Sequence, residues 1–568
     1  MNTKKVIQGA IVQALATVGI EVDVSTITLE HPAELSHGDY ATSVALQYAK
    51  QAARSPRDLA VALVGAMGTI APVAKIDIAG PGFINFTLSS GALSQSLDEA
   101  RAEDMWGNNT ALEGQSVLME YTSPNLFKPL HIGNLVGNVL GESISRLLEF
   151  SGVSVKRINY PSDIGLTVAK GVWGLQKIHG DPNDIQSLGG AYRVGNEAYE
   201  TDPEAKAEIE AVNKKIYEGS DPELKALRES GIKTSRRHLN EICKKLGTTF
   251  DTEIFESEAA PVGRDIVLSH IDDGIFEKSD GAVVFPERNS GLHTRVFINS
   301  LGLPTYEAKD LGNFKLKNGT YSEWTHYFVV TGVEQREYFQ VVFKAIQKVF
   351  SEAEGKVFRH ITNGFLTPTT GKMSSRKGNV ITGESLIADL VEVAKARAAE
   401  SRADDHEKLA EQIAVAAIKY QILKQSSGKD IVFDRERALS LEGDSGPYLQ
   451  YAYARTNAVI VKAHEQGVLP PLAGEGWGGV EDFGVADTLV RLLHRFPEIV
   501  EYAASELEPH IVAQYLLHLA SAFNSWYAQE QILDGTPAAA HKVAVTEAVN
   551  RTLKNGLWIL GIPAPEKM

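Results

Sequence analysis

Residues 116–160 read SVLMEYTSPNLFKPLHIGNLVGNVLGESISRLLEFSGVSVKRINY, and their pattern decides the fold class. The first segment, SVLMEY, is a compact apolar run with the length of a buried strand. Apolar residues then recur near helical spacing from Leu135 to Phe150, and Ser151-Gly152 closes that run. A second strand is predicted at 154–160. Strand, helix and strand within about 45 residues form a βαβ unit, which predicts a parallel α/β sheet with ligands at the carboxyl ends of its strands.

The segments on either side of this unit differ in character. The N-terminal segment ends in KIDIAGPGFINFTLSS, where alternating apolar residues surround a Gly-Pro-Gly turn, which predicts a small α+β domain. Residues from about 180 to 261 are charged and helix-prone without strand signals, which predicts a helical insertion. Strand-like segments return at 281–286, 294–299 and 325–330, so we expect the sheet to resume there. From about Glu384 onward the pattern is almost wholly helical, with a loop at 469–479.

Composition excludes several classes of protein. No apolar run approaches the roughly 20 residues that span a bilayer, and MNTKKVIQGA has no signal-peptide core, so we expect a cytoplasmic protein. Cys243 is the only cysteine, which excludes an internal disulfide and a thiolate-rich zinc site. The net charge of -16 argues against unspecific coating of nucleic acid, although local basic patches could still hold RNA.

His131 and Gly133 lie where the first predicted strand gives way to the helix. Free backbone N–H groups and the positive end of the helix dipole attract phosphate at such a junction. Glycine lets a base or a phosphate approach the backbone closely, and a histidine ring can donate an N–H to a phosphate oxygen. A lone His-x-Gly at a helix start is also typical of a simple turn.

A second motif, NGFLTPTTGKMSSRKGN at 363–379, has no apolar periodicity. Lys372, Arg376 and Lys377 crowd this Gly- and Ser-rich loop, and their charges suit a phosphate leaving group. A solvated basic turn is the alternative. Together, the two motifs resemble the His-x-Gly-His and Lys-Met-Ser-Lys-Ser signatures of class I aminoacyl-tRNA synthetases.

Four further segments narrow the resemblance to the arginyl-tRNA synthetases. VLMEYTSPNLFKPLHIGN resembles that family's form of the first signature, and LPTYEAKDLG (303–312) its Tyr-x-x-x-Asp-Leu segment. VEQREYFQVVF (333–343) is similar to its Gln-containing strand-to-helix turn, and FDRERALSLEGDSGPYLQYAYAR (433–455) to the hallmark of its helical domain. The resemblance covers nearly the whole chain, and the helical insertion is its least specific part.

The resemblance implies an arginine–tRNA ligase that forms arginyl-adenylate from L-arginine and ATP, and then transfers arginine to tRNA(Arg). ATP would be a substrate and Mg²⁺ would accompany it, and no structural metal is expected. We also expect a monomer. The implied fold is a Rossmann-like parallel-sheet catalytic domain with a helical insertion, an N-terminal α+β domain and an all-α anticodon-binding domain. The expected bounds are 1–110 for the additional tRNA-binding domain, 111–383 for the catalytic domain, about 176–262 for its insertion, and 384–568 for the anticodon-binding domain.

The family motifs carry over to four groups of residues. Catalytic roles are implied for His131, Asn134 and Lys372. ATP contacts are implied for His131, Gly133, Asn134, Lys372, Met373, Ser374, Ser375, Arg376 and Lys377. The arginine pocket would comprise Glu120, Ser123, Asn125, Tyr306, Asp310 and Gln335. Contacts with tRNA are expected for Asn85, Phe86, Tyr448, Tyr515 and Trp526.

Physical chemistry supports these assignments and leaves alternatives open. A guanidinium offers five donors in a planar fork, so Asp310 or Glu120 should pair with it. Taken singly, Tyr306 could be a core residue, Asp310 a helix cap and Gln335 a surface residue. Aromatic side chains at 510–529 could stack on unpaired anticodon bases, but such spacing is also typical of a core.

Three departures from the family pattern concern the nucleotide site. Asn134 replaces the second histidine of the first signature and cannot become cationic. Residues 162–165 read SDIG where the family has Gly-Asp-Trp-Gly, and Ser375 replaces the second lysine of the general class motif. Two rival interpretations remain: a class I synthetase for glutamine, glutamate or cysteine, and a non-catalytic tRNA-binding paralogue.

Overall fold

A parallel sheet forms the centre of the larger of two compact units in the computed structural model, which describes residues 3–369, 382–470 and 486–568. Within those residues its five strands have the order β11-β10-β4-β5-β6 and are all parallel. Their bounds are β4 Ser116–Glu120, β5 Ser154–Asn159, β6 Thr252–Glu253, β10 His326–Gly332 and β11 Val357–Asn363. Helix α5 (Ile132–Phe150) joins β4 to β5, which confirms the predicted βαβ unit.

The strand order changes direction between β4 and β10. From β4 the chain continues through α5 to β5 on one side, whereas β10 is followed by β11 on the other. In an open α/β sheet, ligands bind in the crevice outside the carboxyl ends of the strands at such a switch point. Glu120 and Gly332 end these two strands, so the loops that follow them border the expected ligand site.

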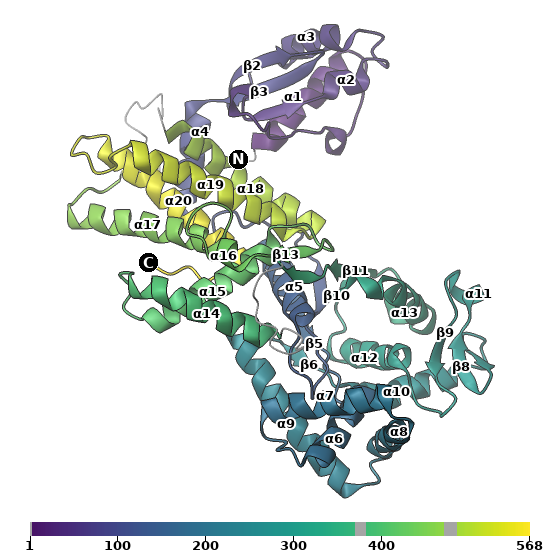
Figure 1. Cartoon of the computed structure of the whole chain (residues 1–568). Coiled ribbons are helices and arrows are strands. Elements are labelled where there is room, and N and C mark those ends of the chain that lie inside the picture. Colours follow the sequence, from purple (N-terminus) through teal and green to yellow (C-terminus); the bar gives the residue numbers. More distant parts are fainter. Residues whose placement is uncertain (1–2, 370–381, 471–485) are drawn as a thin grey trace. The chain divides into compact units, whose positions relative to one another are not determined.

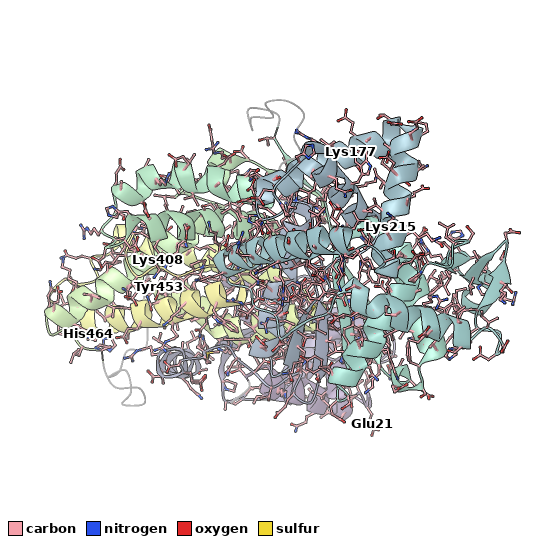
Figure 2. All side chains as sticks on the ribbon, turned by 90° about the horizontal axis from the view of Figure 1, so that it is seen from below. Glu21, Lys177, Lys215, Lys408, Tyr453 and His464 are labelled. Atoms are coloured by element: carbon pink, nitrogen blue, oxygen red, sulfur yellow. The ribbon has the colours of Figure 1, made fainter. Side chains whose placement is uncertain are left out.

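The chain between β5 and β6 is helical, as the sequence predicts, and Figure 1 shows these helices grouped together. Their bounds are α6 Leu166–Ile178, α7 Ile185–Thr201, α8 Pro203–Glu218 and α9 Pro222–Lys245. Asp202 and Asp221 cap α8 and α9 at their N-termini, each followed by a proline at the first helical position. Figure 2 labels Lys177 and Lys215 on these helices, where they form ion pairs with Glu208 and Asp221.

The strands at 281–286 and 294–299 do not extend the parallel sheet, which corrects that expectation. They form β8 (Ala282–Phe285) and β9 (Arg295–Ile298), which pair antiparallel in a separate sheet with β7 (Glu277–Ser279). The reason is the short connections: parallel neighbours need a crossover of about a dozen residues or more, usually a helix. The parallel sheet instead resumes at β6 and, after α12 (Tyr306–Thr320), at β10.

Helices dominate the chain after the sheet. The bounds of these helices are α14 Gly383–Ala399, α15 His406–Leu423, α16 Arg435–Ala438, α17 Gly446–Glu465, α18 Asp487–Glu506, α19 Pro509–Gln529 and α20 Ala539–Ile559. Three other helices lie before β11: α10 Glu256–Ser269, α11 Glu287–Ser290 and α13 Arg336–Val349. One short exception is β13 (Ile431–Phe433), which pairs in parallel with β12 (Leu366–Pro368). The almost wholly helical pattern predicted from Glu384 onward is therefore confirmed for the described residues.

The smaller unit comprises Met1–Gly107, Ala452–Ile499 and Tyr515–Asn555. Its N-terminal part has the antiparallel sheet order β1-β3-β2, which confirms the predicted α+β fold. The Gly-Pro-Gly turn joins β2 to β3, and Gly80 and Gly82 have positive φ of 51° and 141° there. The bounds are α1 Thr3–Thr17, β1 Tyr40–Thr42, α2 Val44–Tyr48, α3 Pro56–Met67, β2 Val73–Ala79, β3 Phe83–Leu88 and α4 Ser90–Ala102.

In the part of the chain that the structure describes, none of the helices combines the length and the apolar character that crossing a bilayer requires.

Candidate active site

His131 caps the N-terminus of α5 with its own ring. Its Nδ1 accepts a hydrogen bond of 3.1 Å from the backbone N–H of Gly133. An accepting Nδ1 leaves the proton of the neutral imidazole on Nε2, which is then free to donate. Burial and the nearby Lys128 cation lower the pKa of His131 to about 4. The ring is therefore a neutral hydrogen-bond donor at physiological pH, at a helix end that favours anions.

Gly133 leaves room for that ring. A Cβ atom at this position would lie 2.9 Å from Cε1 and 3.0 Å from Nδ1 of His131. Those separations are shorter than the roughly 3.5–4.0 Å of an ordinary contact between carbon atoms. Glycine at this position therefore allows His131 to fold over the helix terminus.

Asn134 links the start of α5 to the loop after β4 by a hydrogen bond. Its Nδ2 donates a 3.1 Å hydrogen bond to the backbone carbonyl of Thr122. That loop includes Thr122, Ser123 and Phe127, whose φ values are 74°, 34° and 64°. Positive φ costs energy for residues with a Cβ and persists where the surroundings fix it. The side chain of Asn134 is thus committed to positioning the loop that carries the predicted arginine contacts.

The segment that follows the second predicted motif contacts the first motif. Thr382 forms an isolated antiparallel bridge with His131, and the N–H of Gly383 donates to the carbonyl of Leu130 at 2.8 Å. These contacts bring two segments about 250 residues apart in sequence to one helix terminus. The predicted ATP contacts Lys372, Met373, Ser374, Ser375, Arg376 and Lys377 lie outside the described residues.

Glu120, at the carboxyl end of β4, is nearly buried and already paired. Its Oε2 accepts hydrogen bonds from Lys317 Nζ, from Asn313 Nδ2 at 3.1 Å and from the Tyr327 hydroxyl at 3.0 Å. Lys317 is itself 0% exposed. Glu120, which was expected to pair with a substrate guanidinium, therefore has an internal counter-ion. All three donors bind the same one of its two carboxylate oxygens.

Asp310 has no lysine or arginine within ion-pair distance among the described residues. The Tyr338 hydroxyl donates to its Oδ2 at 2.6 Å. Burial, and then the charge of Glu120, raise the pKa of Asp310 to about 8, while Tyr338 and Lys317 oppose the shift. Such a carboxyl would ionise more readily beside a cation. This environment is typical of a carboxyl that binds a positively charged ligand.

The other predicted arginine contacts differ in exposure. Ser123 Oγ accepts from the N–H of Tyr160 at 3.3 Å, and Asn125 forms a backbone bridge with Ser162. Tyr306 is 50% exposed at the start of α12. Gln335 is exposed in the short turn that follows β10. All of them lie at carboxyl ends of strands or at the N-terminus of α12, so the fold collects them at one edge of the sheet.

Asp163, in the segment that departs from Gly-Asp-Trp-Gly, holds neighbouring helices together. Its carboxylate accepts from Arg228 on α9 at 2.6 Å and from the N–H of Ser257 on α10 at 2.8 Å. Ile164 is buried, at 7% exposure. In this structure the segment therefore anchors the insertion to the sheet.

Two residues that donate hydrogen bonds to Glu120 were not among the predicted site residues. Lys317 and Asn313 follow Asp310 on α12 at i+7 and i+3, which is one helix face, so the spacing carried a signal. Tyr160 was also not predicted, and nothing in its sequence context pointed to the site. Its hydroxyl is buried and has no hydrogen-bond partner among the described residues, although Glu256, Asp310 and Glu120 lie close enough to raise its pKa.

Most of the predicted tRNA contacts are buried. Phe86 is 0% exposed, Trp526 4% and Tyr515 6%, and the Tyr515 hydroxyl donates to the carbonyl of Leu492. A base cannot stack on a ring that the core encloses, so their burial favours the core interpretation over tRNA contact. Asn85 is also largely buried, at 9%, whereas Tyr448 on α17 is partly exposed.

No group of three or more His, Cys, Asp or Glu side chains is arranged to hold a metal ion within residues 3–369, 382–470 and 486–568.

Three family models match the chain. Residues 96–435 match the model described as tRNA synthetases class I (R), catalytic domain. Residues 449–568 match the DALR anticodon binding domain, and residues 5–88 the arginyl tRNA synthetase N terminal domain. The first model alone covers more than half of the chain.

Curated relatives and solved structures give the same result. An arginine–tRNA ligase from Streptococcus suis is 30% identical over 585 residues, which cover 100% of both chains. One from Bacteroides thetaiotaomicron is 27% identical over 590 residues and 97% of both chains. The arginyl-tRNA synthetase structure from Thermus thermophilus matches 99% of both chains with a TM-score of 0.79 and 25% identity.

Proposed function

This chain belongs to the arginyl-tRNA synthetase family of class I, and from that premise we propose how its site performs the reaction. The enzyme ligates L-arginine to its tRNA in two steps, through arginyl-adenylate, and converts ATP to AMP and pyrophosphate. The observation that carries the proposed site is the bridge between His131 and Thr382, because it brings the chain just after the second signature to the first signature.

ATP binds at the N-terminus of α5. The Nε2–H of His131 donates to a phosphate oxygen, and Gly133 lets the nucleotide approach the backbone. Asn134 contributes by holding the loop after β4 rather than by carrying charge. Residues 372–377, with Lys372 foremost, supply the cations for the pyrophosphate leaving group. Mg²⁺ arrives with ATP, since this ion is usually held by substrate phosphates and one or two carboxylates.

Arginine binds beside it, at the carboxyl ends of β4 and β10. Asp310 receives the guanidinium, and the free oxygen of Glu120 provides a second acceptor. Ser123 and Asn125 hold the backbone end of the substrate, while Tyr306 and Gln335 close the pocket from the two later elements. This arrangement is supported by Asp310, a carboxyl with no lysine or arginine partner among the described residues, which suits a cationic side chain.

Catalysis then rests on positioning and charge. The arginine carboxylate attacks the α-phosphate of ATP, the bond to the β-phosphate oxygen breaks, and pyrophosphate leaves. A terminal ribose hydroxyl of the tRNA, the 2′-hydroxyl in this class, next attacks the arginyl carbonyl and releases AMP. No side chain forms a covalent bond to the substrate, so His131 and Lys372 act by stabilising charge on the phosphates.

The enzyme works as a cytoplasmic monomer without a structural metal ion. Its partner is tRNA(Arg), which the N-terminal domain and the helical C-terminal domain bind. Tyr448 is the strongest aromatic candidate among the predicted contacts because its ring remains partly exposed. Asn85 is a further candidate on β3, the central strand of the N-terminal sheet, where it pairs with Ala41 and Asp77.

Amino-acid-dependent ATP–pyrophosphate exchange tests this proposal. The full chain is assayed with arginine, glutamine, glutamate or cysteine, each with and without tRNA. Among the four amino acids, arginine should be the only one that drives exchange, and His131→Ala serves as the inactive control. Exchange driven by another amino acid would replace the specificity assignment. No exchange under any condition would favour a non-catalytic tRNA-binding paralogue.

A further inference from the structure

Two buried lysines pair with two of the three carboxyls around the proposed arginine site. Lys317 donates to Glu120, and Lys309 donates to Glu256 on α10 at 2.6 Å. Asp310 accepts from the Tyr338 hydroxyl and, among the described residues, has no lysine or arginine partner. If each lysine cancels one carboxylate, the site keeps one net negative charge once Asp310 is ionised. A guanidinium carries one positive charge, so the occupied site is neutral.

We propose that Lys317 is a positioning residue for arginine binding: its ammonium fixes one oxygen of Glu120 and cancels that charge, so that the site presents a single net negative charge to the guanidinium. This inference rests on the proposed function and extends it to a residue that never touches the substrate. Lys317 is 0% exposed and lies on the same face of α12 as Asp310, so it acts from beneath the site.

The electrostatic surroundings explain why such a counter-ion is needed. Two carboxylates in one buried site cannot both ionise easily, and an opposite charge nearby lowers a carboxyl pKa by about 1 to 3 units. Lys317 opposes the rise in the pKa of Asp310 that burial and Glu120 cause. Burial lowers the pKa of Lys317 itself, and Glu120 and Asp310 counter that effect. The titratable groups that face this cluster are Glu120 on β4, Tyr160 after β5, Tyr217 on α8, Glu256 on α10, Tyr306, Lys309, Asp310 and Lys317 on α12, Tyr327 on β10, and Tyr338 on α13.

Calorimetric titration of arginine into the full chain between pH 6 and pH 9 tests the inference. In the wild type, affinity should rise with pH and level off near the pKa of Asp310, at about 8. Lys317→Met leaves two carboxylates without this cation, so one of them keeps a proton. We expect the rising limb of the curve of arginine affinity against pH to shift to higher pH by at least about one unit. Binding at pH 7 would then be weaker by about tenfold or more.

A charge-neutral double variant separates this role from a purely structural one. Glu120→Gln combined with Lys317→Met removes one charge of each sign and restores the net charge. Its overall affinity should fall, because Glu120 is a proposed contact, but its rising limb should return to the wild-type pH or below. Lys419→Met removes another buried lysine, one that binds the carbonyls of Leu246 and Gly561, and should leave the limb in place.

Three outcomes decide the matter. If Lys317→Met binds arginine more weakly at every pH, but its affinity rises over the same pH range as that of the wild type, the inference is overturned and the proposed function stays intact. If that variant does not fold, the double variant decides, and a limb displaced above the wild type would also overturn it. Failure of the wild type to bind arginine at any pH would overturn the proposed function, and the inference with it.

Discussion

Gly133→Ala should separate folding from catalysis in this enzyme. The added methyl group would lie 2.9 Å from Cε1 of His131, whereas carbon atoms in contact normally lie about 3.5–4.0 Å apart. The imidazole must therefore move by roughly 0.6–1.1 Å, and the hydrogen bond from the Gly133 N–H to Nδ1 is strained or lost. The ring is the end of a flexible side chain, so the helix itself can accommodate the change.

The change in stability should be small, whereas the change in rate should be large. Alanine in place of a helical glycine favours folding by up to about 1 kcal/mol, but a strained or lost cap hydrogen bond costs about 0.5–2 kcal/mol. A displacement of about 1 Å in a catalytic group can cost a factor of about 10² in rate, equivalent to about 2.7 kcal/mol. Loss of the donor altogether, as in His131→Ala, sets the upper bound at about 10²–10³.

The assay is arginine-dependent ATP–pyrophosphate exchange with tRNA present, beside the urea midpoint of the same preparations. Gly190→Ala on α7 is the matched control, because a Cβ atom there meets nothing within 4 Å. It should gain the same helix propensity and keep the wild-type exchange rate. If Gly133→Ala exchanges within about twofold of the wild type, the orientation of His131 does not matter and the reasoning is refuted.

Further predictions address the other parts of the site. His131→Ala and Lys372→Ala should each slow adenylate formation by about 10²–10³ in single-turnover assays, and an unchanged rate for either would contradict its assignment. Asp310→Asn should abolish the rise of arginine affinity between pH 6 and pH 8, since the group with the raised pKa is gone; a persisting rise would assign it to another group. Asn134→Ala should raise KM for arginine more than KM for ATP, because it frees the loop after β4; equal increases would point to a phosphate contact instead. Trp526→Ala should lower the urea midpoint, as expected for a core residue, rather than weaken tRNA binding in the folded protein.

Local patterns predicted the part of the site that is local in sequence. The βαβ unit follows from apolar periodicity between 116 and 160, and His131 and Gly133 fall at the predicted helix start. Asn134 was expected to face the phosphate. Its hydrogen bond to Thr122 depends on a loop with positive φ, which the sequence does not reveal.

Partners distant in sequence could not be predicted in the same way. Glu120 and Lys317 are separated by 197 residues, and only the fold brings β4 and α12 together. The strands β8 and β9 were recognised, but a strand pattern does not state which sheet it joins. Aromatic spacing likewise does not tell the core face of a helix from an exposed one, as Tyr515 and Trp526 show.

The most direct test of the account is to identify the product that the enzyme forms on tRNA. Purified full-length protein is incubated with unfractionated tRNA, ATP and all twenty amino acids, and the esters released from the tRNA are identified by mass spectrometry. Arginine should be the only esterified amino acid, with one AMP formed for each ester. A different amino acid, ADP in place of AMP, or no ester at all would contradict it.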